Sequence, residues 1–76
     1  MVAFILIKTE KDLGTHILKK MRTMEEFDEV HPLFGEYDLI AKITARDFKQ
    51  TSSIVLTKIR TINGVIETET LPGLTL

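Results

Sequence analysis

Hydrophobic residues in this chain occur in continuous runs at some places and at intervals of three or four residues at others. Residues 2–7 are continuously apolar, and residues 37–44 form a second apolar run in which only Asp38 and Lys42 are charged. Short continuous apolar runs of this kind predict strands that are buried on both faces. We therefore expect these two runs to be the central strands of a sheet.

Two further segments place apolar residues at helical spacing. Asp12 can cap a first helix, whose apolar positions are Leu13, Ile17, Leu18, Met21 and Met24. Asp47 can cap a second helix, which ends at Asn63 and Gly64. The expected inner face of the second helix consists of Phe48, Val55, Ile59 and Ile62.

Two mixed segments predict strands at the edges of the same sheet. Residues 25–34 combine apolar and charged residues with Pro32, whose missing N–H confines it to an edge strand. Residues 65–71 alternate more clearly, and Pro72 and Gly73 break the pattern. The full order is β-α-β-β-α-β, which is typical of the ferredoxin-like α+β fold, with a four-stranded antiparallel sheet and two helices on one face.

Two helices can cover only one face of a four-stranded sheet, yet the central runs carry apolar side chains on both faces. An uncovered apolar face would be larger than a soluble monomer normally exposes. We therefore expect a homodimer that packs sheet face against sheet face. The pattern leaves two candidate faces, one with Phe4, Leu6 and Ile40 and the other with Ile5, Ile7 and Leu39.

The length and composition also favour association. The 76 residues allow a single domain, 1–76, and a chain this short buries only about 60–65% of its unfolded surface. The chain is 43% hydrophobic and has no cysteine, so neither disulfides nor thiolate metal sites supplement its core. Contact with further copies is the remaining common source of stability.

The charge balance disfavours nucleic acid as a direct partner. Ten basic and eleven acidic residues give a formal net charge of −1, without the basic excess of a nucleic-acid-binding domain. The apolar run at residues 2–7 is too short for a signal peptide or a membrane span. We expect a cytoplasmic protein that contacts neither membranes nor DNA directly.

Chemically active groups are densest in residues 34–38, just before the second central run. Gly35 can adopt a positive φ angle, which predicts a tight turn between strands. The turn places backbone N–H groups and the carboxylates of Glu36 and Asp38 beside an apolar surface. A small polar ligand could bind there. Alternatively, Gly35 could serve only the hairpin and Asp38 only bind local N–H groups.

Three segments of the chain together resemble a known family. They are residues 2–8, VAFILIK; residues 34–39, FGEYDL; and residues 54–65, IVLTKIRTINGV. Over its whole length the chain is similar to the effector-binding domain of the Lrp/AsnC (feast/famine) transcriptional regulators, in particular to the stand-alone proteins that consist of that domain. Thr68 and Thr70 fall where this family often has a Thr-x-Thr strand.

The resemblance implies a βαββαβ subunit that dimerises sheet to sheet, with dimers joined into octameric or decameric rings. It also implies that a small molecule, usually an amino acid, binds between dimers. Full-length Lrp/AsnC regulators are then partners to expect in mixed assemblies. The positions that match the family's ligand site are Gly35, Glu36, Tyr37, Asp38, Ser52, Thr68 and Thr70.

Two features depart from the family pattern. We expect no helix-turn-helix domain before residue 2, so the resemblance does not imply DNA binding by this chain. Thr51, Ser52 and Ser53 stand where relatives often carry an acidic side chain, which makes a neutral effector more expected than a lysine- or arginine-type one. Read without the resemblance, these three residues predict a solvent-exposed helix face.

The sequence predicts no catalytic constellation, metal site or cofactor. His16 and His31 lie far apart, and neither has a second ligand at metal-binding spacing. Two other functions stay open. One is a small dimeric ferredoxin-like (α/β-barrel) enzyme, which would use His31 or Tyr37 in an internal apolar cavity. The other is a pure assembly module that forms mixed oligomers with full-length regulators.

Overall fold

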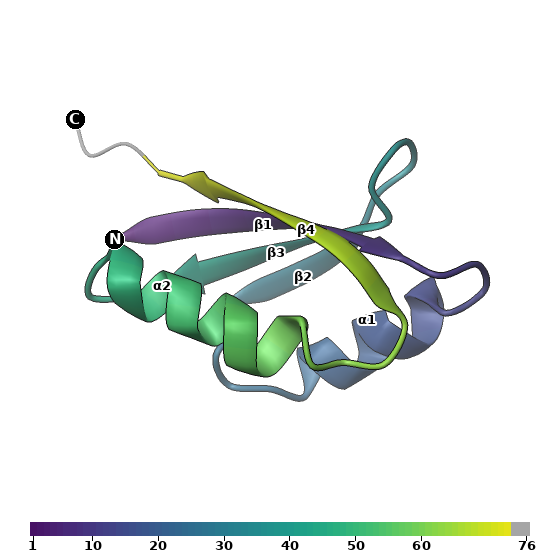
Figure 1. Ribbon diagram of the computed structural model, residues 1–76, viewed down its shortest axis with the longest axis horizontal. Helices are drawn as coiled ribbons and strands as arrows, with labels where there is room; N and C mark the ends of the chain where they lie inside the picture. Colours follow the sequence, from purple (N-terminus) through teal and green to yellow (C-terminus); the bar gives the residue numbers. More distant parts are fainter. Residues whose placement is uncertain (74–76) are drawn as a thin grey trace.

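The structure, a computed structural model, describes residues 1–73 as one four-stranded sheet with helices packed against it (Figure 1). In chain order the elements are β1 (Val2–Thr9), α1 (Gly14–Arg22), β2 (Glu29–Pro32), β3 (Leu39–Thr44), α2 (Phe48–Ile54), its π-helical continuation η1 (Val55–Ile59), and β4 (Val65–Pro72). The sheet is antiparallel and has the order β2-β3-β1-β4. The predicted ferredoxin-like α+β fold, with β1 and β3 at its centre, is confirmed.

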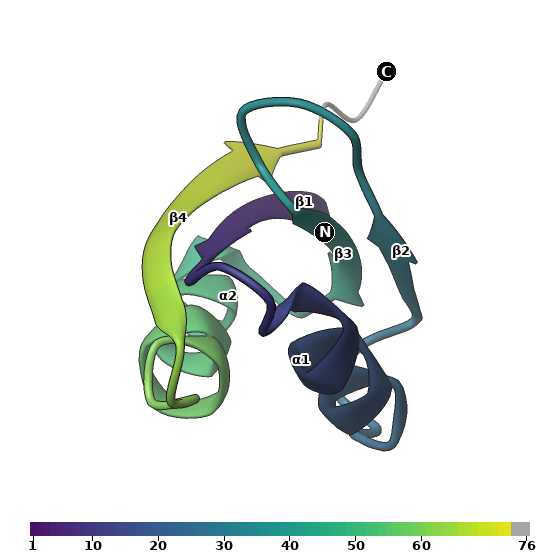
Figure 2. The same cartoon turned by 90° about the vertical axis from the view of Figure 1, so that its right-hand side faces the viewer.

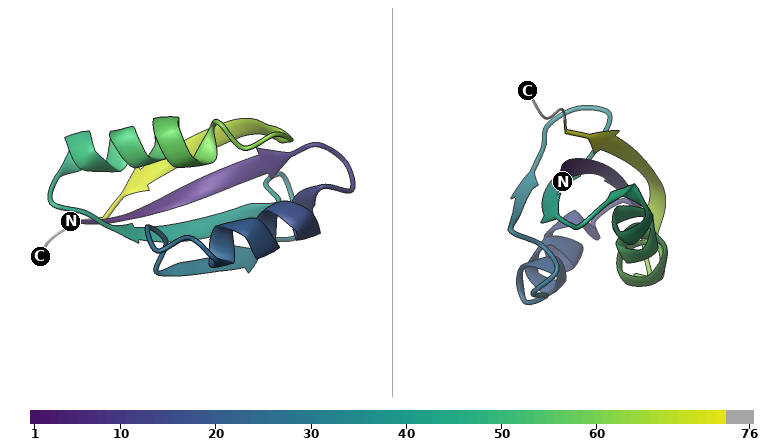
Figure 3. Two further views of the ribbon diagram at one scale, coloured as in Figure 1. Left: turned by 90° about the horizontal axis from the view of Figure 1, so that it is seen from below. Right: turned by 90° about the vertical axis from the view of Figure 1, so that its left-hand side faces the viewer.

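Both helices lie on the same side of the sheet, and its other side is open (Figure 2, Figure 3). The core on the covered side is formed by central-strand residues that are at most 1% exposed: Ala3, Ile5, Ile7, Leu39, Ala41 and Ile43. Alternate residues point the other way, and Phe4 is 38% exposed. The prediction that the central strands are buried on both faces is therefore wrong within a single subunit, because nothing in this chain covers their second face.

Helix α1 begins without the cap that the sequence predicts. Asp12 has a φ of +69°, a left-handed conformation that aspartate tolerates better than most residues. It lies in a turn closed by the Leu13 N–H, which donates to the Glu10 carbonyl at 3.1 Å. Leu13 takes the N-cap position and makes no side-chain capping bond. The predicted inward positions Ile17 and Met21 are fully buried.

Helix α2 begins at its predicted cap, where the Asp47 carboxylate accepts a hydrogen bond from the Gln50 N–H at 2.8 Å. Thr51 is fully buried, and its hydroxyl donates to the Asp47 carbonyl at 3.1 Å. The expected exposed face at residues 51–53 is therefore wrong at Thr51. Phe48 is 54% exposed rather than inward-facing, because it is the first residue of the helix and Thr51 begins the buried stripe.

The second helix widens into the π turn η1 before the chain enters β4. The Arg60 N–H donates to the Val55 carbonyl, five residues earlier, at 2.9 Å. The predicted inward residues Val55, Ile59 and Ile62 are buried. The π turn therefore leaves the inner face of the helix intact.

Both edge strands take the predicted positions, but the segments around β2 are less regular than expected. β2 has only four residues, because residues 25–28 form a turn that buries Phe27 in the core. The link from β2 to β3 is a loop of residues 33–38 rather than a tight turn. The Leu33 N–H closes this loop by donating to the Asp38 carbonyl at 2.8 Å.

Candidate functional site

The loop of residues 33–38 carries the predicted ligand-binding turn and projects from the end of the sheet on the open side (Figure 1, Figure 2). Gly35 has a φ of +146°, and a Cβ added there would meet nothing within 4 Å. Gly35 and Glu36 are exposed. This part of the turn is therefore available to a ligand or to a neighbouring copy.

Asp38 ties the loop to the end of β1. Its Oδ2 accepts a hydrogen bond from the Thr9 N–H at 2.8 Å and a second from the Thr9 hydroxyl at 3.3 Å. The Asp38 N–H in turn donates to the Ile7 carbonyl at 2.9 Å. The alternative to a ligand role was that Asp38 binds only backbone N–H groups close to it in sequence. The Asp38 side chain does bind a backbone N–H, but this N–H belongs to a residue 29 positions earlier.

Tyr37 extends from this loop toward two carboxylates of β4. Partial burial is the main cause that raises the pKa of its phenol above the ordinary 10.0, and the negative charges of Glu69 and Glu67 raise the pKa further. The loop therefore reaches the open side of β4, where these two carboxylates lie.

The strand threonines of the predicted site face the side of the sheet that the helices cover. Thr68 pairs with Ile7 and Thr70 pairs with Ile5, and directly paired residues share a face, so both threonines point toward the helices. Both are half-buried, as is Ser52 on α2. Both threonines lie on β4, and β1 stands between this strand and β3, which the turn enters, so the predicted ligand-binding residues do not form one complete site within a subunit.

A hollow of about 170 Å³ lies between Asp38 and the start of α1. It is lined by Gly14, Thr15, Leu18, Pro32, Asp38 and Leu39. Ligand sites typically enclose about 300–1,000 Å³, so a molecule bound here would be only partly enclosed by one subunit. Thr15 was not among the predicted site residues, because a threonine in the first turn of a helix carries no motif.

The open face of the sheet has an apolar centre and a charged margin. Its centre is formed by Phe4, Leu6, Ile40 and Leu71. Its margin is formed by Lys8, Glu29, His31, Lys42, Glu67 and Glu69. Of the two faces considered for dimerisation, the one with Phe4, Leu6 and Ile40 is therefore uncovered, whereas the alternative face lies beneath the helices.

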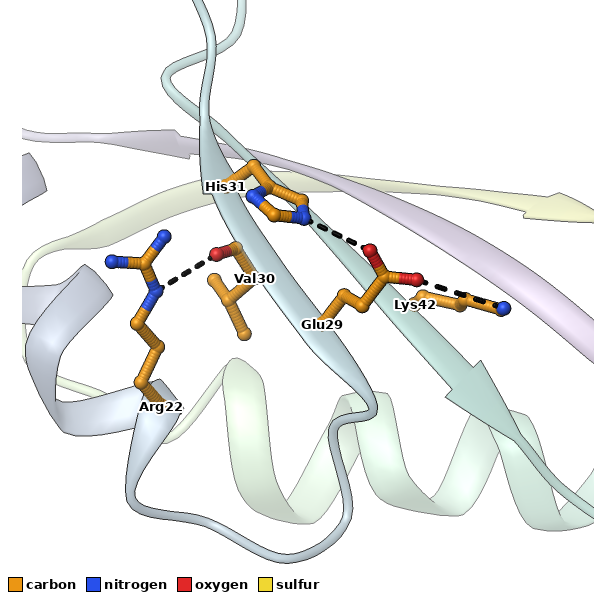
Figure 4. A network of polar contacts seen from close by, with 5 residues as sticks. All are labelled: Arg22, Glu29, Val30, His31 and Lys42. Atoms are coloured by element: carbon orange, nitrogen blue, oxygen red, sulfur yellow. Dashed lines mark hydrogen bonds and ion pairs between the residues drawn. The ribbon is translucent and has the colours of Figure 1, made fainter.

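A polar network crosses this margin at β2 and β3 (Figure 4). The Glu29 carboxylate lies 3.0 Å from His31 Nε2 through Oε1 and 3.6 Å from Lys42 Nζ through Oε2. The hydrogen bond with His31 and the charge of Lys42 lower the pKa of Glu29 below its ordinary 4.5. Nearby, Arg22 Nε donates to the Val30 carbonyl at 2.9 Å and so joins the end of α1 to β2.

His31 and Tyr37, which an enzyme of this fold would use, belong to different surroundings. His31 is part of the network with Glu29, whereas Tyr37 lies near the carboxylates of β4. Within residues 1–73, no group of three His, Asp or Glu side chains is arranged to hold a metal ion. In the same range, no helix is long and apolar enough to cross a membrane.

Sequence comparison connects this fold and these residues with a family of regulators. A sequence model of the Lrp/AsnC ligand binding domain matches residues 2–74. An uncharacterized HTH-type transcriptional regulator of Pyrococcus abyssi is 35% identical over 72 residues, which are 91% of this chain and 48% of the relative. The regulatory protein AsnC of Escherichia coli K12 is 30% identical over 67 residues, 88% of this chain and 43% of the relative. This chain therefore spans about half the length of the curated relatives it matches.

Solved structures share the fold of this chain. A hypothetical protein from Pyrococcus horikoshii superposes with a TM-score of 0.87 and 31% identity, over 100% of this chain and 93% of that chain. A transcriptional regulator from Neisseria meningitidis, solved as a complex with L-Met, superposes with a TM-score of 0.82 over 97% of this chain and 49% of that chain. At 22% identity, the second likeness shows only that the fold is shared.

Proposed function

Because this chain belongs to the Lrp/AsnC ligand-binding domain family, we propose that it binds an amino acid as a small zwitterionic effector and assembles into oligomers that serve transcriptional regulation. The observation that carries this proposal is the family match over residues 2–74, a range that includes both the turn and the strand threonines. Its relatives are transcriptional regulators rather than enzymes, which favours a regulatory role over a catalytic one.

The turn supplies the groups that a zwitterion needs. Backbone N–H groups around Gly35 can bind a carboxylate, and the Asp38 carboxylate can accept from an ammonium group. The Thr9 hydrogen bonds hold Asp38 in place before a ligand arrives, which lowers the cost of ordering it. The L-Met complex of a Neisseria meningitidis regulator with the same fold supports an amino acid as the ligand class.

A second subunit would complete the site. The hollow beside Asp38 is small for a ligand site, and neither Thr68 nor Thr70 is among the residues that line it. We infer that the turn of one dimer meets Ser52, Thr68 and Thr70 of a neighbouring dimer, with the effector between them. Because Thr51, Ser52 and Ser53 carry no charge, a neutral side chain on the effector fits better than a basic one.

Assembly starts from the open face in this proposal. Two copies bury Phe4, Leu6 and Ile40 against each other, and these dimers join into an octameric or decameric ring. Contacts with DNA come from full-length Lrp/AsnC regulators in mixed assemblies, because a chain with net charge −1 neutralises few phosphates.

A thermal-shift screen against the twenty amino acids tests the proposal. A ligand at 100 times its Kd adds about 2.7 kcal/mol to the free energy of unfolding, so a true effector raises the melting temperature clearly. We expect one or a few neutral amino acids to do so. If none does while the protein still forms oligomers, the effector role fails and the chain is an assembly module alone.

A further inference from the structure

Among the described residues, Phe34 is the most exposed large hydrophobic side chain. It lies in the 33–38 loop beside Leu33, which is itself 40% exposed. The loop rises on the side of the sheet that the helices leave uncovered (Figure 2). A fully exposed aromatic side chain next to an uncovered apolar face is typical of an anchor in a protein interface.

We propose that Phe34 of one copy docks into a hollow on the open face of a second copy, and that the second copy's Phe34 does the same in return. The occupant of the hollow is thus a second copy of this chain. The inference rests on the homodimer of the proposed function and identifies the side chain that holds it together. In a two-fold interface each such contact occurs twice.

The hollow has the size and lining that a phenyl ring requires. It measures about 150 Å³, with Phe4 and Ile40 as its apolar lining and Glu29, His31 and Lys42 at its rim. An apolar cavity of about 150 Å³ accommodates benzene. The rim charges are already paired, since Glu29 contacts both His31 and Lys42, so an entering ring leaves no isolated charge behind.

The charges of the open face favour a second copy over a polyanion. Lys8 and Lys42 are interspersed with Glu29, Glu67 and Glu69 along the margin. Because both signs are present in nearly equal number, two identical faces can meet without strong net repulsion. Nucleic acid or an anionic lipid surface would instead meet a slightly negative face.

The area of the open face also indicates that the loop contributes. Strands of four to eight residues, at about 3.3 Å per residue and about 4.8 Å apart, present a projected area of roughly 400 Å². The accessible area is larger than this projected area, because side chains protrude from the sheet. A stable interface nevertheless buries about 800 Å² on each partner. One phenylalanine can add about 150–250 Å², which makes Phe34 a substantial part of the remainder.

The first test compares Phe34→Ala with Phe48→Ala by sedimentation equilibrium. Phe48 is a matched control, because it is an exposed phenylalanine that lies on α2, on the covered side of the sheet. Loss of an aromatic anchor should raise the dimer dissociation constant by about 30-fold or more. For Phe48→Ala we expect a change of less than about threefold. Equal effects, or no effect of Phe34→Ala, would overturn the proposal.

The second test is cross-linking, which the cysteine-free sequence makes selective. Copies with Leu33→Cys are mixed with copies with His31→Cys, so that Phe34 itself is kept, and a short bismaleimide is added. We expect cross-linked heterodimers because His31 rims the hollow. A mixture of Lys49→Cys, on α2, with His31→Cys serves as the control and should give none. A dimeric sample in which Leu33→Cys also gives none contradicts the docking.

Failure of this inference can be told apart from failure of the proposed function. A monomeric wild type would overturn both the docking and the proposed homodimer. A wild-type dimer that Phe34→Ala leaves intact would overturn the docking alone. If the Phe34→Ala variant forms intact dimers but no ring, the docking proposal is also overturned, because Phe34 would then lie between dimers rather than within one. The amino-acid screen decides the effector role independently of all three outcomes.

Discussion

The carboxylate of Asp38 accepts a hydrogen bond from the Thr9 N–H at 2.8 Å, although 29 positions separate the two residues. This bond joins the end of β1 to the point where the 33–38 loop returns to the sheet. It uses one oxygen of the side chain that we propose to contact the ammonium group of an effector. Asp38 therefore has a structural role, the bond to Thr9, and a proposed binding role, the contact with the ammonium group. Different substitutions are needed to test the two roles separately.

Asp38→Ala should lower the free energy of unfolding by about 1–3 kcal/mol, because it leaves a buried backbone N–H without its acceptor. Asp38→Asn keeps an oxygen in that position and should lose less. Thr9→Val keeps the N–H bond and removes only the longer hydroxyl bond of 3.3 Å, so it should also lose less. Urea denaturation of the three variants measures how much each lowers the free energy of unfolding and so ranks them. A wild-type value for Asp38→Ala would show that the bond does not stabilise the fold.

Gly64→Ala should destabilise the protein by about 1–3 kcal/mol. Gly64 has a φ of +104°, and an added Cβ would lie 2.7 Å from Leu13 Cδ1 and 3.2 Å from Ile17 Cδ1. Gly14→Ala is the matched control, since its Cβ would meet only the Thr9 hydroxyl, at an ordinary 3.5 Å. Gly14→Ala should be neutral or stabilising by up to about 1 kcal/mol. Thermal unfolding that ranks the two variants in the opposite order would contradict the packing at Gly64.

The phenol of Tyr37 should titrate above pH 10.0, because burial and the charges of Glu69 and Glu67 favour its neutral form. In the unfolded chain the phenol loses its proton first, so stability should fall as the pH rises past that value. The chain has one tyrosine and no tryptophan, so phenolate absorbance reports Tyr37 alone. Glu69→Gln should move the titration toward 10.0, and an unchanged curve would place Glu69 away from the ring.

The fold could be predicted because its signals are local. Continuous apolar runs marked β1 and β3 as central strands, and Asp47 with Gln50 formed a cap that depends only on neighbours in sequence. Asp12 had the same chemistry as Asp47, but its turn conformation is set by tertiary contacts, including the Glu10 N–H bond to the Gly64 carbonyl at 2.8 Å. A capping residue therefore predicts a helix start only where the preceding loop is free to adopt the cap.

The candidate site was harder to predict because its contacts join distant segments. No spacing rule connects Asp38 with Thr9, or Tyr37 with Glu69. The sequence predicted Phe48 on the buried side of α2 and Thr51 on the exposed side, and the structure has the reverse. Thr51 can be buried because its hydroxyl donates to the backbone carbonyl four residues earlier. The continuous apolar runs did predict a sheet face that the helices leave uncovered, but only packing of the helices determined that Phe4 rather than Ile5 lies on it.

The purified 76-residue chain should not retard DNA in a gel shift at physiological salt, about 0.15 M. Its net charge is −1, and its basic residues do not form one cluster that could neutralise several phosphates at once. A full-length Lrp/AsnC regulator with its cognate site is the positive control. Sub-micromolar binding by the chain alone would contradict the proposed division of roles.

Calorimetric titration of the amino acid identified in the thermal-shift screen tests the effector role most directly. The samples are wild type, Asp38→Asn, which retains an acceptor for Thr9, and the control Asp12→Asn, an exposed carboxylate in the turn before α1. We expect saturable binding to wild type and to Asp12→Asn, and an affinity lower by about tenfold or more in Asp38→Asn, because the hydrogen bond to the ammonium group loses its charge. Equal affinity in all three samples would place the effector elsewhere, and no binding to wild type at millimolar amino acid would contradict the effector function itself.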